Sequence, residues 1–507
     1  MPVFETIETK GIPVKIFTDQ IEDQARQQLI DLAESGLVVG HIAAMPDVHY
    51  GMGATVGSVF ASEHYICPNA VGVDIGCGMA AIPIPNLKSS HLSWDQKQEI
   101  HSEIKKRVPT GMSAHDKPRT APVLDNPNRS KWLNQQISKK TACQIGTLGG
   151  GNHFIELVED KDSQVWIFLH SGSRNIGKVT AENYNKLAKN YMKKQGIQAK
   201  NPDLNFLDLN TKEGQNYLLD MQWCQNFAYD NRQDMLKNVA EILVEKLGTP
   251  ADFNQAVNIH HNYCSCEDCI IDDGNGNLVS RKLWVTRKGA TSAKKDQYGL
   301  IPGSMGTGSF LVKGLGNPES MQSSSHGAGR TKSRTKAKLE ITQKDFEQSM
   351  EGIVCETNEE LRDEAPQAYK EINTVMEWQS DLVQIVTRFQ PLINVKGFDS
   401  SIPAWKQPKI SVVFENPESF QLTIKSILVS KTDYKNSKKS SSEWIPYANW
   451  KQKAGGLRKG NRIQTWVLIE EDPTKKLLIQ STVASSDSNK ATLRIEVVEK
   501  RQKLDGV

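Results

Sequence analysis

The sequence has no long apolar run. No stretch of its 507 residues approaches the run of about 18 apolar residues that would suggest a membrane-spanning helix. The opening residues lack the basic stretch and apolar core of a secretory signal. We therefore expect a cytoplasmic protein without membrane contacts. Hydrophobic residues make up 38% and charged residues 24% of the chain, which is typical of a soluble globular protein, and the length predicts two or more domains.

Two common nucleotide-binding fingerprints are also absent. Residues Gly172 to Lys178 have the Gly-x-x-x-x-Gly-Lys spacing of a P-loop, but Val179 stands where a Ser or Thr hydroxyl would bind Mg²⁺. The sequence also lacks the glycine fingerprint followed by an acidic residue that indicates a dinucleotide site. These absences exclude two large classes of nucleotide-binding protein.

Regular alternation of strands and helices is missing as well, so a doubly wound sheet is not favoured. We predict an α+β fold, with a mixed catalytic body over residues 1–397 and a small all-β module over 408–500, which we expect to be antiparallel. The patterns predict helices over 216–247, 340–350 and 368–389 and a strand over 165–169 in the body. In the module they predict strands over 409–414, 420–429, 463–469, 477–483 and 491–498.

Charge is distributed unevenly between these two parts. Residues 398–507 contain 19 Lys and Arg against 12 Asp and Glu, a net charge of +7, which leaves −4 for the rest of the chain. A basic module favours binding to nucleic-acid phosphates. Protein contact or oligomerisation is an equal alternative.

Several potential metal ligands lie beside glycines. They are Asp74 and Cys77 in Val-Asp-Ile-Gly-Cys-Gly, and then His153, His170 and His261. A thiolate, imidazoles and a carboxylate together suit Zn²⁺, Fe²⁺ or Mn²⁺, and a thiolate can bridge two ions. For any single histidine, a hydrogen-bonded core or loop residue is the alternative interpretation.

Glycine-rich loops and one further histidine point to phosphate chemistry. Residues 146–152 and 302–309 could each present consecutive amide groups to an anion. In Ser-His-Gly-Ala-Gly-Arg at 325–330, His326 is a candidate nucleophile toward phosphorus and Arg330 a candidate partner for phosphate charge. The alternative is an ordinary surface loop. Together these features predict metal-assisted phosphoryl or nucleotidyl transfer.

Three further cysteines, Cys264, Cys266 and Cys269, are closely spaced. Their spacing differs from Cys-x-x-Cys pairs, and a closed zinc site needs a fourth ligand. Accessory metal binding or redox sensitivity therefore competes with the interpretation that they are inert thiols.

Nine motifs together resemble the RtcB-type RNA-splicing ligases over residues 1–397. They are Met45–Gly51, Val73–Gly78, Gly150–Glu156, His170–Arg174, His261-Asn262, Arg287–Thr291, Pro302–Thr307, Ser325–Arg330 and Val395–Gly397. The resemblance implies GTP- and Mn²⁺-dependent joining of RNA 3′-phosphate or 2′,3′-cyclic phosphate ends to 5′-hydroxyl ends, in tRNA splicing or RNA repair. It leaves open an activating protein partner. Residues 398–507 are an extension beyond the family pattern.

The same resemblance implies roles for individual residues. Cys77 would bridge two Mn²⁺ ions, His326 would carry a covalent guanylate, and Asp47 and Arg174 would assist the phosphate site or RNA. The remaining metal ligands would be Asp74, His153, His170 and His261, and the GTP contacts would be Asn152, Glu156, Asn262, Ser304, Ser309, Tyr369 and Lys396.

Two other functions fit the same residues. A metal-dependent phosphatase or cyclic phosphodiesterase would use the metal ligands without a nucleotide, and would not need His326 or Lys396. An RNA-binding accessory protein that has lost sealing activity would not need all of the metal ligands and His326.

Overall fold

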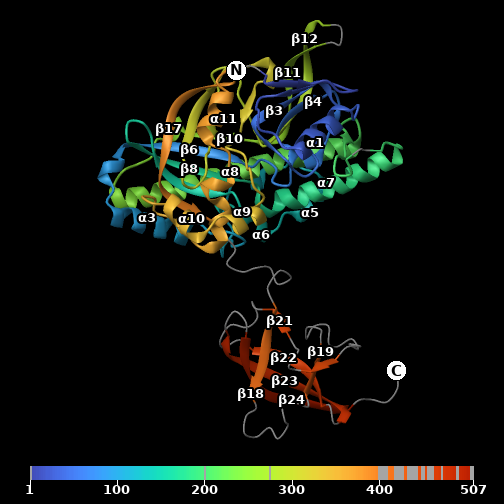
Figure 1. The fold of residues 1–507 in the computed structure, drawn as a ribbon, viewed down its shortest axis with the longest axis vertical. Coiled ribbons are helices and arrows are strands. Elements are labelled where there is room, and N and C mark those ends of the chain that lie inside the picture. The colour runs from blue at the N-terminus through green and yellow to red at the C-terminus, as the bar shows by residue number, and fades with distance from the viewer. Residues whose placement is uncertain are drawn as a thin grey trace. The chain divides into compact units, whose positions relative to one another are not determined.

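The computed structural model describes residues 3–198, 201–272 and 276–397, and beyond residue 397 it describes the backbone of seven strands. The chain divides into two compact units, residues 1–398 and 399–507 (Figure 1). Helices and strands are mixed in the first unit and the described elements of the second are all strands, which confirms the predicted α+β class. Within the described ranges, no helix combines the length and apolar character needed to cross a bilayer.

Two large sheets form the centre of the first unit. One contains, in spatial order, β1 (Glu5–Ile7), β2 (Val14–Ile16), β3 (Val39–His49), β4 (Val56–Ser62), β12 (Leu278–Lys288) and β11 (Asn262–Asp272). The other contains β10 (Val257–His260), β6 (Gly78–Lys88), β8 (Gln164–Ser171), β7 (Phe154–Glu159), β17 (Val383–Lys396), β15 (Ser309–Gly314) and β14 (Tyr298–Ile301). Two short pairs join β5 (Tyr65–Ile66) to β9 (Leu207–Asp208), and β13 (Ala290–Ser292) to β16 (Ser323–Ser325).

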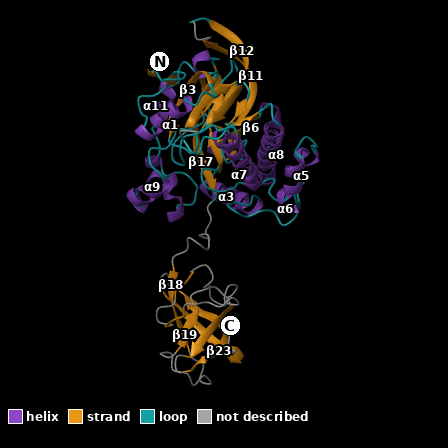
Figure 2. Ribbon diagram, turned by 90° about the vertical axis from the view of Figure 1, so that its right-hand side faces the viewer, coloured by secondary structure: helices purple, strands orange, loops and turns teal. Residues whose placement is uncertain are grey.

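Helices surround these sheets (Figure 2). The α-helices are α1 (Asp23–Ala33), α2 (Pro68–Val71), α3 (Trp94–Arg107), α4 (Pro122–Asp125), α5 (Lys131–Gln136), α6 (Lys139–Ala142), α7 (Arg174–Lys194), α8 (Lys212–Leu247), α9 (Arg334–Glu340), α10 (Gln343–Ser349) and α11 (Ile372–Trp378). Short 3₁₀ turns are η1 (Ser89–His91), η2 (Phe253–Gln255), η3 (Pro318–Ser320), η4 (Glu359–Glu364) and η5 (Pro366–Ala368).

The long helix α8 is the main support of the seven-stranded sheet. The predicted helix over 216–247 is confirmed within it, and its ends have clear causes. The side chain of Thr211 accepts a hydrogen bond from the Gly214 amide at the start, and Gly248 adopts a left-handed φ of 69° at the end. Its apolar residues pack with α3 against strands β6, β7, β8 and β17 in one core cluster.

Two buried polar residues of α8 bind the backbone around the strand ends. The Asn231 side chain accepts from the Thr147 amide and donates to the carbonyls of Thr147 and Gly172. The Arg232 guanidinium donates to the carbonyls of Gly76 and Ser171, each at 2.9 Å. These bonds satisfy backbone groups that would otherwise be buried without partners. The helix thereby holds three separate loops at one edge of the sheet.

Two further helix predictions have different outcomes. The helix expected over 340–350 is confirmed as α10, which begins three residues later than predicted because Thr342 caps it by accepting from the Asp345 amide, and Glu340 is the last residue of α9. The helix expected over 368–389 is wrong in its second half, where β17 begins at Val383. Strand β17 pairs with β7 on one side and β15 on the other, so sheet pairing determines its conformation.

The described strands of the second unit form one sheet in the order β20 (Trp444–Pro446), β19 (Ile427–Ser430), β22 (Arg462–Ile469), β23 (Asp472–Ser486), β24 (Lys490–Gln502), β18 (Lys409–Glu415) and β21 (Lys451–Lys453). The expectation of a purely antiparallel module is wrong, because β18 and β24 pair in parallel. More than the dozen or so residues that a parallel crossover requires separate these two strands in the chain. Much of the strand predicted over 420–429 lies outside the described residues.

Arg232 provides a test of how α8 supports the strand ends. We expect Arg232→Met to lower the free energy of unfolding by about 3 kcal/mol, because the Gly76 and Ser171 carbonyls lose a buried charged donor. Thermal unfolding should show a drop of several degrees in Tm. The control is Lys237→Met, which changes an exposed residue of the same helix. Equal Tm values for the two variants would contradict this account.

Candidate active site

Strand register brings the predicted metal ligands together at the same end of four neighbouring strands of the seven-stranded sheet. His170 on β8 is paired with Met79 on β6 and with Phe154 on β7, so Cys77 and His153 each precede a strand at the same level. His260 on β10 is paired with Gly78, which places His261 beside Cys77. The residues are far apart in sequence and adjacent because these four strands are neighbours.

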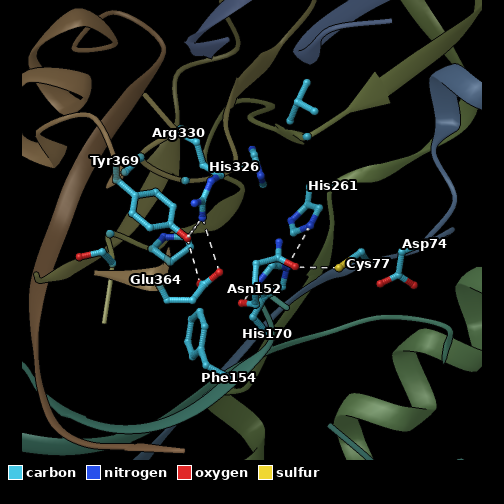
Figure 3. Close-up of a pocket in the computed structure, with 18 of the residues that line it drawn as sticks. Asp74, Cys77, Asn152, Phe154, His170, His261, His326, Arg330, Glu364 and Tyr369 are labelled. Atoms are coloured by element: carbon cyan, nitrogen blue, oxygen red, sulfur yellow. Dashed lines mark hydrogen bonds and ion pairs between the residues drawn. The ribbon is translucent and has the colours of Figure 1, made fainter. Parts of the chain in front are cut away.

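The ligand atoms converge closely. Cys77 Sγ lies 3.2 Å from His170 Nε2 and 3.4 Å from His153 Nε2, and His170 Nε2 lies 3.2 Å from His261 Nε2. Asp74 Oδ2 lies 3.0 Å from His153 Nε2. Two groups of possible ligands result, one of Cys77, His170 and His261 and the other of Asp74, Cys77 and His153, and they share the thiol. Figure 3 shows Cys77 with His170, His261 and Asp74.

The turn that carries Asp74 and Cys77 is tight. The Cys77 amide donates to the Asp74 carbonyl at 3.1 Å, and the Gly76 amide donates to the Asn262 carbonyl at 2.8 Å. Gly76 has a φ of 71°, and a Cβ there would lie 2.7 Å from the Cα of Gln225 on α8. A glycine is therefore required for the turn to lie against the helix while presenting both ligands.

The protonation of this cluster suits a cation. His153 and His170 each use Nδ1 to donate to a backbone carbonyl, of Leu148 and Asn152 respectively, which leaves the Nε2 lone pairs facing the thiol. Burial lowers the pKa of His170 and His261 well below the usual value, so both rings are neutral. Burial, and then the Asp74 charge, raise the pKa of the Cys77 thiol, so a thiolate here needs a compensating positive charge. The donor set therefore fits one or two divalent transition-metal ions.

His326 lies next to this cluster and is oriented by a buried carboxylate. Asp47, on β3, is fully buried, and its Oδ2 accepts from His326 Nδ1 at 2.6 Å. The same oxygen accepts from the amides of His326 and Gly327. With the proton held on Nδ1, the Nε2 lone pair of His326 is available as a nucleophile. The His326 ring centroid lies 4.8 Å from that of His261.

Gly329 allows the segment that carries His326 to lie close to the backbone of Asp47 on β3. It has a φ of 74°, and a Cβ there would lie 2.5 Å from the Asp47 carbonyl oxygen. The glycines of the Ser325–Arg330 motif thus have a steric role at this position, allowing the chain to wrap around Asp47.

A pocket of about 330 Å³ opens beside His326 and the cluster. The predicted residues that line it are Asp74, Cys77, Asn152, Glu156, His170, His261, Asn262, Ser304, Ser309, His326, Arg330, Tyr369 and Lys396. They come from both large sheets and from the loops between them. The structure therefore brings four of the five predicted metal ligands, the nucleophile and all seven predicted GTP contacts to one cavity.

One carboxylate organises the side of the pocket away from the metal ligands. Glu364 accepts from Lys396 Nζ at 2.5 Å, from the Tyr369 hydroxyl at 2.9 Å and from Arg334 Nη1 at 2.5 Å. Arg330 Nη1 lies 3.5 Å from it. Figure 3 shows Glu364, Tyr369 and Arg330 together on this side of the pocket. Burial alone would raise the pKa of Glu364, but the charges of Lys396 and Arg334 hold it at about 2. This residue is ionised at neutral pH and links four groups of the pocket.

Other predicted pocket residues have specific neighbours. Glu156 on β7 is paired with Asn394 on β17 and accepts from its amide at 2.6 Å. Burial raises the pKa of Glu156 to about 8. The Arg330 guanidinium lies 4.9 Å from the ring centroid of Tyr369. One face of that ring is thus occupied by a cation.

Three predicted site residues do not line the pocket. His153 and Asp47 lie behind it, where they contact Cys77 and His326. Arg174 begins α7 and donates to the Gly111 carbonyl at 2.7 Å and to the Thr147 hydroxyl at 3.0 Å. In the loop predicted to bind an anion over 146–152, the amides of Thr147 and Leu148 donate instead to Asn231 and Pro109.

The three clustered cysteines do not form a site. They lie on β11, where alternation places Cys269 on the opposite face from Cys264 and Cys266. Burial raises the pKa of Cys264 to about 12 and of Cys269 to about 11. Among the described residues, the groups of possible metal ligands are the two that share Cys77. The interpretation as inert thiols is favoured.

Sequence reasoning missed several pocket residues, of which Glu364 is the most important. It lies in Glu-Glu-Leu-Arg-Asp-Glu at 359–364, a composition typical of a solvated surface segment. Arg334 was missed for a similar reason, because it belongs to a run of basic residues, which is also typical of a solvated surface. Asn394 was identifiable only through its register with Glu156. No local signal distinguishes these residues from surface charges or strand residues.

Comparison with known proteins gives the family. The family model described as tRNA-splicing ligase RtcB matches residues 28–126 and 123–397. The RNA-splicing ligase RtcB of Escherichia coli strain K12 is 39% identical over 417 residues, which cover 78% of this chain and all of that protein. This chain belongs to the tRNA-splicing ligase RtcB family. The resemblance recognised in the sequence is therefore confirmed.

More distant relatives of the RtcB family also cover most of the chain. The tRNA-splicing ligase RtcB of Nanoarchaeum equitans is 29% identical and covers 76% of this chain and 96% of its own length. The RNA-splicing ligase RtcB homolog 1 of Entamoeba dispar is 28% identical and covers 70% of this chain and 78% of its own length. The RtcB model ends at residue 397, so the pocket lies within the matched region and the second unit lies outside it.

Cobalt binding tests the assignment of the ligand cluster. We expect the wild type to bind two Co²⁺ ions with a thiolate-to-cobalt absorption band in the near ultraviolet, because the two ligand groups share Cys77. Cys77→Ser should remove the band and weaken Co²⁺ binding by at least about tenfold.

The matched control is Cys355→Ser, which removes a thiol that does not line the pocket. An unchanged absorption band in Cys77→Ser would rule out the shared-thiolate arrangement.

Proposed function

We propose that this chain is an RNA ligase that joins a 3′-phosphate or 2′,3′-cyclic phosphate end to a 5′-hydroxyl end with GTP, in tRNA splicing or RNA repair. The observation that carries the proposal is the His326–Asp47 pair, which presents a free imidazole nitrogen to a pocket next to a cluster of possible metal ligands. Family membership supports RNA as the substrate.

The first step is transfer of GMP to His326. The Nε2 atom of His326 attacks the α-phosphorus of GTP, a nitrogen–phosphorus bond forms, and the bond to the β-phosphate oxygen breaks with release of pyrophosphate. Asp47 keeps its hydrogen bond to Nδ1 throughout and stabilises the positive charge that develops on the ring, as the aspartate of a catalytic triad does. Both residues come from motifs that the sequence analysis identified.

The second and third steps use the same site. A 3′-phosphate oxygen of the RNA attacks the histidine-bound phosphorus, which breaks the nitrogen–phosphorus bond and returns the lone pair to His326. The RNA 5′-hydroxyl then gives its proton to water and attacks the activated 3′-phosphate, so a phosphodiester bond forms and the phosphoanhydride bond to GMP breaks. A 2′,3′-cyclic phosphate must first be opened by water.

The metal ligands and the Glu364 side of the pocket have complementary roles. Mn²⁺ would be held by Asp74, Cys77, His153, His170 and His261, and when bound it supplies positive charge that offsets charge on the phosphoryl oxygens. On the other side, Glu364 positions Lys396 and Tyr369 for the nucleotide. Asn152, Glu156, Asn262, Ser304 and Ser309 supply further polar groups along the pocket.

Covalent labelling tests the role of His326. Incubation with GTP labelled at the α-phosphate and Mn²⁺, followed by a denaturing gel, should label the wild type, whereas His326→Ala should carry no label, because the attacking nitrogen is gone. His101→Ala is the matched control, because it removes a half-buried histidine that does not line the pocket.

The same experiment distinguishes the proposal from its main alternative. A label that persists in His326→Ala contradicts the assignment of this histidine. Absence of label in folded, metal-loaded wild type, together with release of phosphate from RNA ends, favours a phosphatase or cyclic phosphodiesterase.

Glu364 can be tested separately from the covalent step. In a His326→Ala background, which prevents adduct formation, we expect Glu364→Gln to weaken GTP binding by at least about tenfold. The reason is that Lys396 and Tyr369 lose the charged acceptor that orients them. Equilibrium binding of labelled GTP measures the change.

The control for this prediction is Glu360→Gln, which removes an exposed carboxylate from the same 3₁₀ segment η4. Equal dissociation constants for the two double variants would show that Glu364 does not position the nucleotide contacts.

A further inference from the structure

The seven-stranded sheet of residues 399–507 has two chemically different faces. Register pairs Ile463, Ser481 and Ile495 across β22, β23 and β24, and pairs Val483, Leu493 and Phe414 across β23, β24 and β18. Alternation therefore assigns mostly apolar residues to this face. The residues between them belong to the opposite face, which we call the polar face. Antiparallel and mixed sheets of this pattern pack one face and leave the other to water.

Four lysines share one corner of the polar face. Lys409 on β18 is paired with Lys453 on β21. In the neighbouring row, Ser411 on β18 is paired with Lys451 on β21 and with Lys490 on β24. The corner is thus built from three adjacent strands, β24, β18 and β21, labelled in Figure 1.

No acidic residue is paired with this corner among the described strands. Glu415, the acidic residue of β18, is paired with Arg494 two polar-face positions further along the strand. Lys409 and Lys453 occupy directly paired positions, and like charges at paired positions generally disfavour a sheet unless an anion offsets them. Continuing away from the corner, Arg462 and Arg494 lie in one row through Thr482. Glu415 ends this row beside Arg494, and Glu496 lies in the next row of β24, so the basic residues without a paired acidic residue are those of the corner.

We propose that the polar face around Lys409, Lys451, Lys453 and Lys490 binds the phosphate backbone of single-stranded RNA. The choice of RNA rests on the proposed function and on charge complementarity, since a group of lysines on one face of a sheet matches a chain of phosphates without selecting bases. The second unit lies beyond the family model, so this contact is additional to the pocket.

Two other roles for the same corner would be recognised by the experiment described below. Lysines on an edge strand such as β21 also protect a sheet from pairing with another chain. A protein with an acidic surface would fit the same charges. Both alternatives predict that RNA affinity is unaffected when the four lysines are neutralised.

The experiment uses the full chain and an RNA that cannot be sealed. A labelled uridine homopolymer of about 30 nucleotides with hydroxyls at both ends is titrated by fluorescence anisotropy between about 50 and about 200 mM salt. Replacing all four corner lysines with Gln should weaken binding by at least about tenfold. It should also reduce the slope of log affinity against log salt by up to about 3, at about 0.7 per lost phosphate contact.

Two matched variants make the result decisive. Lys→Arg at the same four positions keeps the charge and should bind like the wild type, which separates loss of contact from loss of folding. Lys→Gln at Lys186, Lys189, Lys193 and Lys194, exposed residues of α7, makes the same change in net charge and should leave affinity nearly unchanged. Wild-type affinity in the corner Gln variant, or an equal loss in the α7 variant, overturns the proposal.

Covalent GMP labelling of each variant keeps this proposal separate from the ligase proposal. The corner Gln variant should still form the adduct, because none of its changes lies in the pocket. A wild type that binds this RNA through the corner but forms no adduct would refute the GMP-transfer chemistry and leave the binding surface intact.

Discussion

The rest of the first unit depends on the burial of a cluster of lone pairs around Cys77. Imidazole nitrogens, a thiol and a carboxylate meet at distances of 3.0 to 3.4 Å within a protein interior. Without a cation such a cluster is costly, because buried acceptors face one another. The surrounding structure holds it in place. Backbone carbonyls bind the Nδ1 atoms of His153 and His170. Gly76 lets the ligand turn lie against α8, and Arg232 ties that turn to the end of β8. Binding energy from metal is thus available to stabilise the edge of the sheet.

The pocket combines two opposite electrostatic environments. On one side, the Cys77 thiol and the neutral rings of His170 and His261 need a positive charge to act together as ligands. On the other side, Lys396, Arg330 and Arg334 surround the carboxylate of Glu364. His326 contacts the first side through the ring of His261 and is held by Asp47 from behind. A triphosphate placed here would therefore meet cations in both directions, while its base would lie among groups fixed by Glu364. Such fixed charges need little reorganisation during phosphoryl transfer.

The site residues that could be predicted are those that lie within local sequence motifs. The sequence identified Cys77, His326 and the glycine-flanked histidines because few purely structural contexts combine such side chains with glycines at these positions. Glu364 was not, because its burial depends on partners as distant as Lys396, and an acidic segment looks the same whether solvated or buried. The fold shows the same division. The helix α8 follows from its own periodicity, whereas residues 383–389 of β17 were mistaken for helix because their conformation is determined by pairing with β15. The parallel pairing of β18 with β24 likewise depends on contacts between the two ends of the second unit.

The position of β17 has a consequence for how the protein is made. It is the last strand of the first unit in the chain, yet it lies between β7 and β15 inside the sheet and carries Lys396. Until residues 383–396 leave the ribosome, β7 and β15 both have an unpaired edge, which can form hydrogen bonds with other chains. The 109 residues of the second unit follow this strand. Translation of that unit therefore gives β17 time to insert and close the sheet while the nascent chain is still tethered and kept apart from its neighbours.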